Sequence, residues 1–203
     1  WAPTVYKLNA EKLDPDFLNQ TCRYTICIVT LVFSLVGLLS WIIPLFLPDE
    51  YQNIQYIVCA CLGYPLLYSL SEVTVVGIGI ARKSHLSMLA TVIACFVNIL
   101  GNYLLIPHFG AAGAAASTCF SFFIMFILRT EFAIYCWEPL PRKTLYPYTI
   151  CAVIGAILSS IFAHEITNYL IIFWCILLVI TLLKFINEIK NGFAFAKNLI
   201  NLK

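Results

Sequence analysis

The chain has 203 residues, of which 62% are hydrophobic and 11% are charged, and its formal net charge is +2. A typical soluble domain is about 45–50% apolar and about 25% charged, so this composition excludes most soluble classes and intrinsic disorder. Nucleic-acid binding is excluded as well, because so small a net charge provides no basic surface. The composition instead predicts an all-α fold, a polytopic bundle of transmembrane helices.

Six continuous apolar stretches are long enough, or nearly long enough, to cross about 30 Å of hydrocarbon as helices. In chain order they are Tyr24–Leu47, Ile54–Ala81, Leu86–Ile106, Ala111–Leu128, Tyr148–Ala163 and Ile166–Leu183. The fifth stretch is the shortest. Pro44 and Pro65 predict kinks in the first and second stretches.

The basic residues occupy alternate connections between these six spans. These residues lie in four places: before the first span, between the second and third spans, between the fourth and fifth spans, and after the sixth span. They are Lys7, Lys12, Arg23, Arg82, Lys83, Arg129, Arg142, Lys143, Lys184, Lys190, Lys197 and Lys203. The positive-inside rule places these connections, and both termini, in the cytoplasm. Two of the three outside connections leave room only for a turn.

The spans fall into three groups. Residues 1–130 are expected to form a core of three to four spans with a preceding cytoplasmic segment. Residues 131–183 are expected to add two peripheral helices, because the sixth span is apolar on all sides and so predicts a lipid-facing position. The tail at 184–203 mixes lysines with large apolar residues, which predicts a basic amphipathic segment on the cytoplasmic surface.

Glu72 is the one clear ionisable residue inside a predicted span. Tyr64, Tyr68 and Glu72 are spaced by four and so share a helical face. A charged group in the bilayer is costly, which makes Glu72 a candidate proton or cation site, or an acceptor for a hydroxyl-rich substrate. The alternatives are a protonated Glu72 bonded to a neighbouring helix, or a Glu72 high enough in the helix to be solvated.

Other polar and small residues point first to helix packing. Asn98 and Asn102 are four apart, and a hydrogen bond to another helix is the favoured interpretation, with a role in a substrate pathway as the alternative. The small residues that begin at Gly110 and include Gly113 allow two backbones to approach closely, as do Gly77 and Gly79.

Nothing in the sequence predicts catalysis. We find no paired carboxylates, no Ser/His/Asp arrangement and no metal-ligand spacing, and the nine cysteines lie in predicted spans or cytoplasmic segments, where no disulfide framework is expected. No cofactor or metal is expected, and a carrier that works by conformational change fits better than an enzyme.

The segment from Val97 to Thr118, with the sequence VNILGNYLLIPHFGAAGAAAST, resembles a signature of bacterial polysaccharide flippases. The shared pattern is two Asn residues in a helix, then Leu-Ile-Pro, a polar residue, an aromatic, and a Gly-Ala-rich helix start. Gly77–Lys83 resembles the end of the preceding helix in that family, and Trp1–Pro3 with Tyr6 and Lys7 resembles the cytoplasmic end of an earlier one. The resemblance covers residues 1–130, and it identifies O-antigen flippases of the Wzx type.

This resemblance implies membership of the multidrug, oligosaccharidyl-lipid and polysaccharide exporter superfamily, whose members have two similar helix bundles around a central cavity. It implies movement of a polyprenyl-diphosphate-linked oligosaccharide across the bacterial inner membrane by alternating access, with possible coupling to a proton or sodium gradient. Since the chain begins at Trp1, it is expected to be the C-terminal part of such a protein. Its expected partners are the lipid-linked oligosaccharide, membrane lipids and the N-terminal half.

One feature departs from the family. Such flippases place cationic residues in the cavity to hold the diphosphate, but no Lys or Arg lies in the middle of the spans as bounded above. Arg23 and Arg82 lie near helix ends and could reach in from the cytoplasmic mouth. The favoured expectation is that the anion site lies in the N-terminal half.

Three other functions are weighed against a flippase. A multidrug exporter of the same superfamily is the main alternative. A membrane glycosyltransferase or O-antigen polymerase is disfavoured, because the outside connections are too short to carry acidic catalytic groups. An assembly protein without transport activity is disfavoured by the polar residues of the first three spans.

Overall fold

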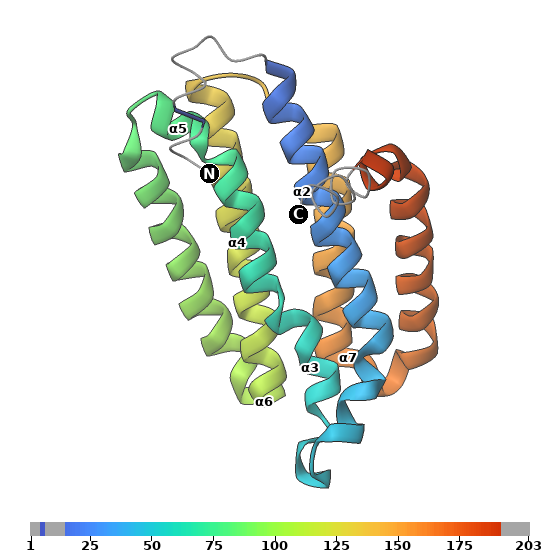
Figure 1. The fold of residues 1–203 in the computed structure, drawn as a ribbon. Coiled ribbons are helices and arrows are strands. Elements are labelled where there is room, and N and C mark those ends of the chain that lie inside the picture. The colour runs from blue at the N-terminus through green and yellow to red at the C-terminus, as the bar shows by residue number, and fades with distance from the viewer. Residues whose placement is uncertain (1–4, 7–14, 192–203) are drawn as a thin grey trace, which may run out of the picture.

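A computed structural model of the chain describes residues 5–6 and 15–191. Within these residues the fold is entirely helical, and its long helices run side by side in alternating directions (Figure 1). Five helical segments are long and apolar enough to cross a membrane: Phe17–Phe46, Ile54–Thr74, Ser84–Cys136, Arg142–Phe162 and Ile166–Lys184. The predicted class of an all-α bundle of membrane-length helices is therefore confirmed.

The first segment is the α-helix α2 (Pro15–Leu39), which continues as the 3₁₀ helix η1 (Ser40–Phe46). Pro44 explains the change, since it has no N–H to donate to the Ser40 carbonyl and its ring disfavours regular α geometry there. A second 3₁₀ turn, η2 (Asp49–Tyr51), completes the connection.

The second segment is divided into α3 (Ile54–Cys61), α4 (Gly63–Thr74) and α5 (Val76–Ile80). The first break, at Leu62, follows from Pro65, which cannot donate to the Cys61 carbonyl, so the predicted kink is present. At the second break the Ile78 N–H donates to the Val75 carbonyl (2.9 Å), a tighter turn than the α-helix makes. The single span expected at Ile54–Ala81 is thus too long, because its last turns form a separate short helix.

The long helix α6 (Ser84–Cys136) is a hairpin with two arms, residues 84–109 and 111–136, that meet at Gly110. Gly110 has φ +54° and ψ −129°, a conformation that favours glycine. The second arm continues to Cys136, whereas the sequence pattern predicted an end at Leu128. Arg129 therefore lies within a helix and not in a connection, which corrects our expectation for it.

The last helix, α7 (Arg142–Lys184), bends at Ile166, where φ is −124° and ψ is 23°. Its first part begins at Arg142 and not at Tyr148, so the segment Arg142–Phe162 is as long as Ile54–Thr74. Its second part matches the predicted sixth span closely. Residues 186–191 are again helical, and the rest of the predicted amphipathic tail lies outside the described residues.

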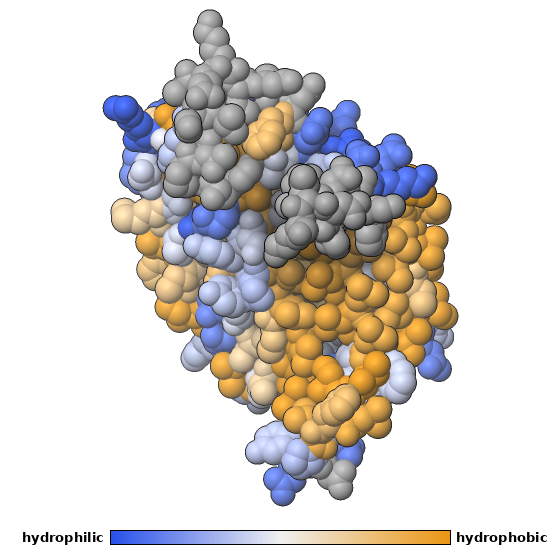
Figure 2. Space-filling model, viewed as in Figure 1, coloured by the Kyte–Doolittle hydropathy of each residue, from blue (hydrophilic) through white to orange (hydrophobic). Residues whose placement is uncertain are grey.

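The basic connections share one end of the bundle. Residues 81–83, residues 137–141 and the end of α7 lie at this end, whereas residues 47–53 and Gly110 lie at the opposite end (Figure 1). The first of these, which we call the basic end, carries Arg82, Lys83, Arg142, Lys143 and Lys184. Between the two ends, Figure 2 shows a largely hydrophobic surface.

The core lies between α2, α3, α4, the second arm of α6, and α7. Trp174 is its largest fully buried side chain, and its indole N–H donates to Ser159 Oγ (3.3 Å). A Cβ at Gly37 or Gly155 would overlap the ring of Trp174, so both glycines make room for it. This packing fixes α2 against both parts of α7.

Candidate ion-pair site in the helix bundle

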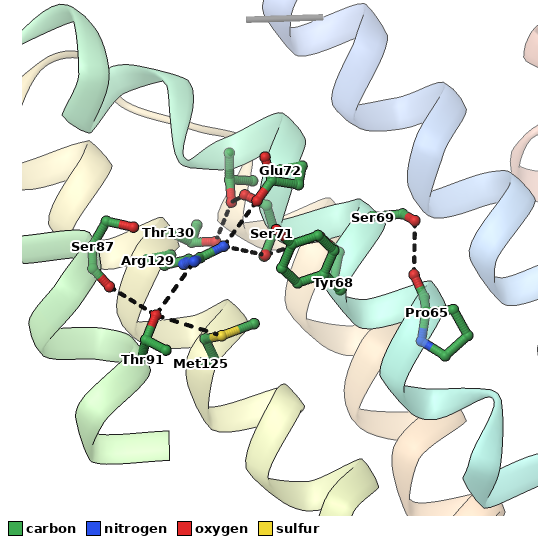
Figure 3. Close-up of polar contacts among 11 residues, drawn as sticks. Pro65, Tyr68, Ser69, Ser71, Glu72, Ser87, Thr91, Met125, Arg129 and Thr130 are labelled. Carbon is green, nitrogen blue, oxygen red and sulfur yellow. Dashed lines mark hydrogen bonds and ion pairs between the residues drawn. The ribbon is translucent and has the colours of Figure 1, made fainter. Parts of the chain in front are cut away.

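Arg129 is the centre of the most connected polar cluster in the described structure. Its side chain is 10% exposed, and Nη1 donates to Glu72 Oε1 (3.0 Å) and to Ser71 Oγ (3.2 Å). Nη2 donates to Thr91 Oγ1 (3.3 Å). Arg129 thus joins α4 to both arms of α6 (Figure 3).

Aromatic rings line one side of this cluster. The guanidinium carbon of Arg129 lies 5.6 Å from the centre of the Tyr68 ring, within the range of a cation–π contact. Tyr64 packs against both Tyr68 and Phe122, with ring centres 6.3 Å and 4.7 Å away. Tyr64, Tyr68 and Glu72 therefore share one face of α4, as predicted, and all three side chains are partly exposed on it.

Hydroxyl groups surround the ion pair. Thr91 donates to the Ser87 carbonyl (3.0 Å), which leaves its oxygen free to accept from Arg129. Next to Arg129 in the chain, Thr130 donates to Thr74 (2.9 Å) and ties α6 to α4 a second time. These short bonds hold the side chains around Arg129 in fixed positions.

The ion pair opens on a recess of about 480 Å³ between α4, α5 and the first arm of α6. Its polar lining residues are Tyr6, Glu72, Ser84, Ser87, Thr91 and Arg129, and Val75, Ile78, Gly79 and Met88 complete the lining. A guanidinium stays charged in any protein environment, and Nε of Arg129 is buried without a hydrogen-bond partner among the described residues. The recess therefore offers an anion one fixed cation, and offers a polyhydroxylated group several donors and acceptors.

Sequence reasoning missed Arg129, because Arg-Thr-Glu at 129–131 resembles the start of a polar connection. A charge inside a span costs about 2.5–3.5 kcal/mol on insertion scales, so the pattern favours ending the span before it. The available signal was the apolar run that resumes at Phe132–Trp137. That run allows two more helical turns beyond Leu128.

Asn98 links the two arms of the α6 hairpin, and Asn102 bonds to Asn98 within the first arm. Asn98 Nδ2 donates to Thr118 Oγ1 (3.2 Å), and Ser117 Oγ donates to the Asn98 carbonyl (3.1 Å). Asn102 Nδ2 donates to Asn98 Oδ1 (3.1 Å), while its own Oδ1 is buried without a partner in the described part of the chain. The expected bond to another helix is present for Asn98, and neither Asn lines the recess beside Glu72.

Arg23 and Arg82 lie apart from the Glu72 site. Arg23 Nε donates to Glu188 Oε1 (2.6 Å), a residue of the helical turn that follows α7. Arg82 lies in the turn between α5 and α6 with φ +53° and an exposed side chain. The structure thus places Arg23 at the contact of α2 with the helical turn that follows α7, and Arg82 on the surface of the basic end.

The four glycines proposed for packing differ in their roles. A Cβ at Gly113 would lie 2.5 Å from the Leu105 carbonyl oxygen, so Gly113 permits close approach of the two arms of α6. A Cβ at Gly77 would lie 3.3 Å from the Ala133 carbonyl oxygen, and one at Gly79 would overlap Tyr6. Gly110 has nothing within 4 Å of its Cβ position, so it serves the turn and not a packing contact.

A second ion pair closes the connection between α6 and α7. Arg142 Nε and Nη2 donate to the two carboxylate oxygens of Glu131, at 2.9 Å and 2.6 Å, and the Tyr146 hydroxyl donates to the same carboxylate. Both side chains are partly exposed, Arg142 by 51% and Glu131 by 37%. This pair fixes the connection at 137–141.

The described residues contain no group of three or more His, Cys, Asp or Glu side chains that could hold a metal ion. The cysteines among them are free thiols. Comparisons of the chain with protein-family models, with curated proteins and with solved structures gave no match.

Proposed function

We propose that this chain belongs to a flippase that moves a polyprenyl-diphosphate-linked O-antigen or other polysaccharide repeat unit across the bacterial inner membrane by alternating access. The observation that supports this most is the Arg129–Glu72 pair inside the bundle, at the edge of a recess of about 480 Å³. A guanidinium binds the oxygens of a diphosphate through charge-assisted hydrogen bonds, and sugar hydroxyls require the donors and acceptors that Ser84 and Ser87 provide. The resemblance of residues 97–118 to polysaccharide flippases is the second support.

Arg129 resolves the departure from the family described above. On this proposal the cation that holds the diphosphate is Arg129, rather than Arg23, Arg82 or a residue outside the chain. Arg23 is engaged by Glu188, and Arg82 lies on the surface of the basic end. Arg129 alone among these three arginines is both buried and next to an open recess.

The proposed mechanism is an exchange of anions on Arg129. An incoming diphosphate competes with the Glu72 carboxylate for Nη1 of Arg129. Since Arg129 joins α4 to both arms of α6, loss of its bond to Glu72 loosens the contact between these helices. A ligand that breaks this bond in one conformation only would shift the population of conformations, as alternating access requires.

We further propose that the chain crosses the membrane six times with both ends in the cytoplasm. Each arm of α6 is longer than the roughly 20 residues needed for one crossing, and the hairpin would count as two spans. The support for the orientation is the concentration of Lys and Arg at the basic end, which the positive-inside rule assigns to the cytoplasm.

A second helix bundle, the N-terminal half expected from the resemblance, is proposed to face α4. Figure 2 shows a paler and bluer strip that crosses the hydrophobic surface over α4, where Tyr64, Tyr68 and Ser69 are exposed and Glu72 is partly exposed. Polar side chains of this kind are costly against lipid. A second bundle across this strip would enclose a central cavity with Arg129 at its wall.

Binding and export together test the proposal. We expect the purified chain to bind a polyprenyl diphosphate, and Arg129→Gln to weaken that binding about tenfold or more, since a charge-assisted bond is lost. Export of lipid-linked oligosaccharide in cells that lack their own flippase is expected to fall in parallel, and also in Glu72→Gln. The control is Arg142→Gln, which removes the same charge from an exposed pair. Normal binding and export by Arg129→Gln at normal membrane levels would contradict the proposal.

A further inference from the structure

A second polar recess, of about 440 Å³, lies between the start of α2 and the helical turn that follows α7. Asn19, Gln20 and Arg23 line it from α2, and Asn187, Glu188 and Asn191 line it from the other side. Tyr24 is its only aromatic residue. Within each set the residues are one, three or four positions apart and so lie on one face of a helix. Both helices therefore present a polar face to the recess.

Glu188 is the electrostatically unusual residue of this recess. Both Nε and Nη2 of Arg23 bond to its Oε1, at 2.6 Å and 2.5 Å. Its Oε2 is buried and has no hydrogen-bond partner among the described residues. A buried carboxylate oxygen without a donor is unfavourable, so the recess favours a ligand that brings an N–H or O–H group to Oε2.

The same recess has a place for an anion. The side chain of Arg23 is 42% exposed while that of Glu188 is 12% exposed, so Arg23 is the more accessible of the two partners that line the recess. Its Nη1 makes none of the bonds to Glu188. A ligand that fits both Glu188 and Arg23 carries a positively charged hydrogen-bond donor and, a few atoms away, an anionic group.

The position of the recess points to a membrane lipid. It lies beside the end of α7 and the helical turn after it, where Leu182, Leu183 and Ile186 are exposed apolar side chains that acyl chains can cover. Lys184 and Lys190 are exposed on the same segment and would lie near lipid phosphates. The recess is thus placed at the boundary between the hydrophobic surface and the polar basic end.

We propose that this recess binds the head group of phosphatidylethanolamine. The primary ammonium group donates a hydrogen bond to Glu188 Oε2, and the phosphate diester accepts from Arg23 while the surrounding amides bond its remaining oxygens. The trimethylammonium group of phosphatidylcholine has no N–H and cannot make the first bond. The site is separate from the Arg129 recess and does not depend on the proposed transport function.

The test compares lipids that differ only in the head group. The purified full-length chain is placed in nanodiscs that contain equal amounts of phosphatidylethanolamine and phosphatidylcholine with the same acyl chains. Native mass spectrometry then measures which lipid stays bound when the chain is released from the nanodiscs. We expect phosphatidylethanolamine to be retained about tenfold more, the factor that one charge-assisted hydrogen bond supplies. Stepwise N-methylation of the lipid is expected to reduce retention most at the last methyl group, which removes the last N–H.

Two variants locate the effect. Glu188→Gln is expected to bring the retention of the two lipids to parity, while the control Glu50→Gln, a carboxylate at the opposite end of the bundle, leaves the preference intact. Equal retention by the unaltered chain, stronger retention of phosphatidylglycerol, or an unchanged preference in Glu188→Gln would each overturn the proposal. Soluble glycerophosphoethanolamine is expected to compete only weakly, and competition as strong as that of the lipid would overturn the assignment to a membrane lipid.

Discussion

Arg129 and Glu72 form an ion pair whose two side chains differ fourfold in exposure, 10% for Arg129 and 44% for Glu72. The guanidinium keeps its charge when the carboxylate is removed. Breaking a fully buried pair costs about 3–5 kcal/mol, and the exposure of Glu72 reduces this, so we expect Glu72→Gln to lower the free energy of unfolding by about 1–2 kcal/mol. Thermal or denaturant unfolding of the two proteins in detergent measures this difference in the free energy of unfolding.

The coupling between the two side chains can be measured separately. In a double-mutant cycle with Arg129→Met, the loss in the double variant is expected to be smaller than the sum of the single losses by about 1 kcal/mol. The apolar Met leaves no buried charge for Glu72 to compensate. Additive losses would show that the pair does not contribute as a unit.

The α6 hairpin predicts a specific cross-link. A Cβ at Gly101 would lie 3.1 Å from Ser117 Cβ, so a small outward shift of the two arms brings the pair to the roughly 3.5–4.5 Å that a disulfide requires. With the native cysteines replaced, Gly101→Cys combined with Ser117→Cys is expected to form a disulfide on mild oxidation. The matched control combines Gly101→Cys with Phe120→Cys, because Phe120 is exposed and three residues further along. A continuous straight helix would give no cross-link in either pair.

How far the sequence determines the fold is clearest at the prolines and at Gly110. Pro44 and Pro65 act through the loss of one backbone donor, which is a local effect, and the helix changes occur three or four residues before each of them. The turn at Gly110 was predictable as a gap between two apolar stretches. Its left-handed conformation was not, because the sequence does not show which of several glycines takes a positive φ.

The candidate site required tertiary structure. Glu72 was identifiable because a charge in an apolar run is rare, but its partner lies 57 residues away, at a position where hydropathy alone ends the span. Arg129 is tolerated in a helix because Glu72, Ser71 and Thr91 surround it, and this compensation is invisible to a window of neighbouring residues. Likewise, the ion pair of Arg23 with Glu188 becomes visible only in the tertiary structure, because the two residues are far apart in the sequence.

The two ends of the bundle are expected to differ in chemical access. Single cysteines introduced at Glu50 and at Lys83 in a cysteine-free chain would lie at opposite ends, both exposed. If the basic end is cytoplasmic, a membrane-impermeant maleimide labels Glu50→Cys in intact cells and labels Lys83→Cys only after the membrane is opened. The reverse pattern would invert the proposed orientation, and labelling of both in intact cells would contradict a membrane between them.

Gly113 and Gly110 are three residues apart and are expected to respond differently to larger side chains. At Gly113 a Cβ would lie 2.5 Å from a backbone oxygen that cannot rotate away, so Gly113→Ala is expected to cost about 1–3 kcal/mol and Gly113→Val more, since overpacking grows with volume. At Gly110 the space is open and the cost is that of the positive φ, about 1–2 kcal/mol. Gly110→Ala and Gly110→Leu should therefore lose similar stability.

Thermal unfolding of these variants, with the exposed Ala111→Val as the control, distinguishes the two roles. A cost that rises with side-chain size at Gly113 but not at Gly110 is the expected pattern, and Ala111→Val is expected to change stability little because Ala111 is exposed. A rise with size at both glycines would mean that the hairpin turn is itself packed against another part of the protein. No dependence at Gly113 would mean that the arms of α6 are further apart than the Leu105 contact requires.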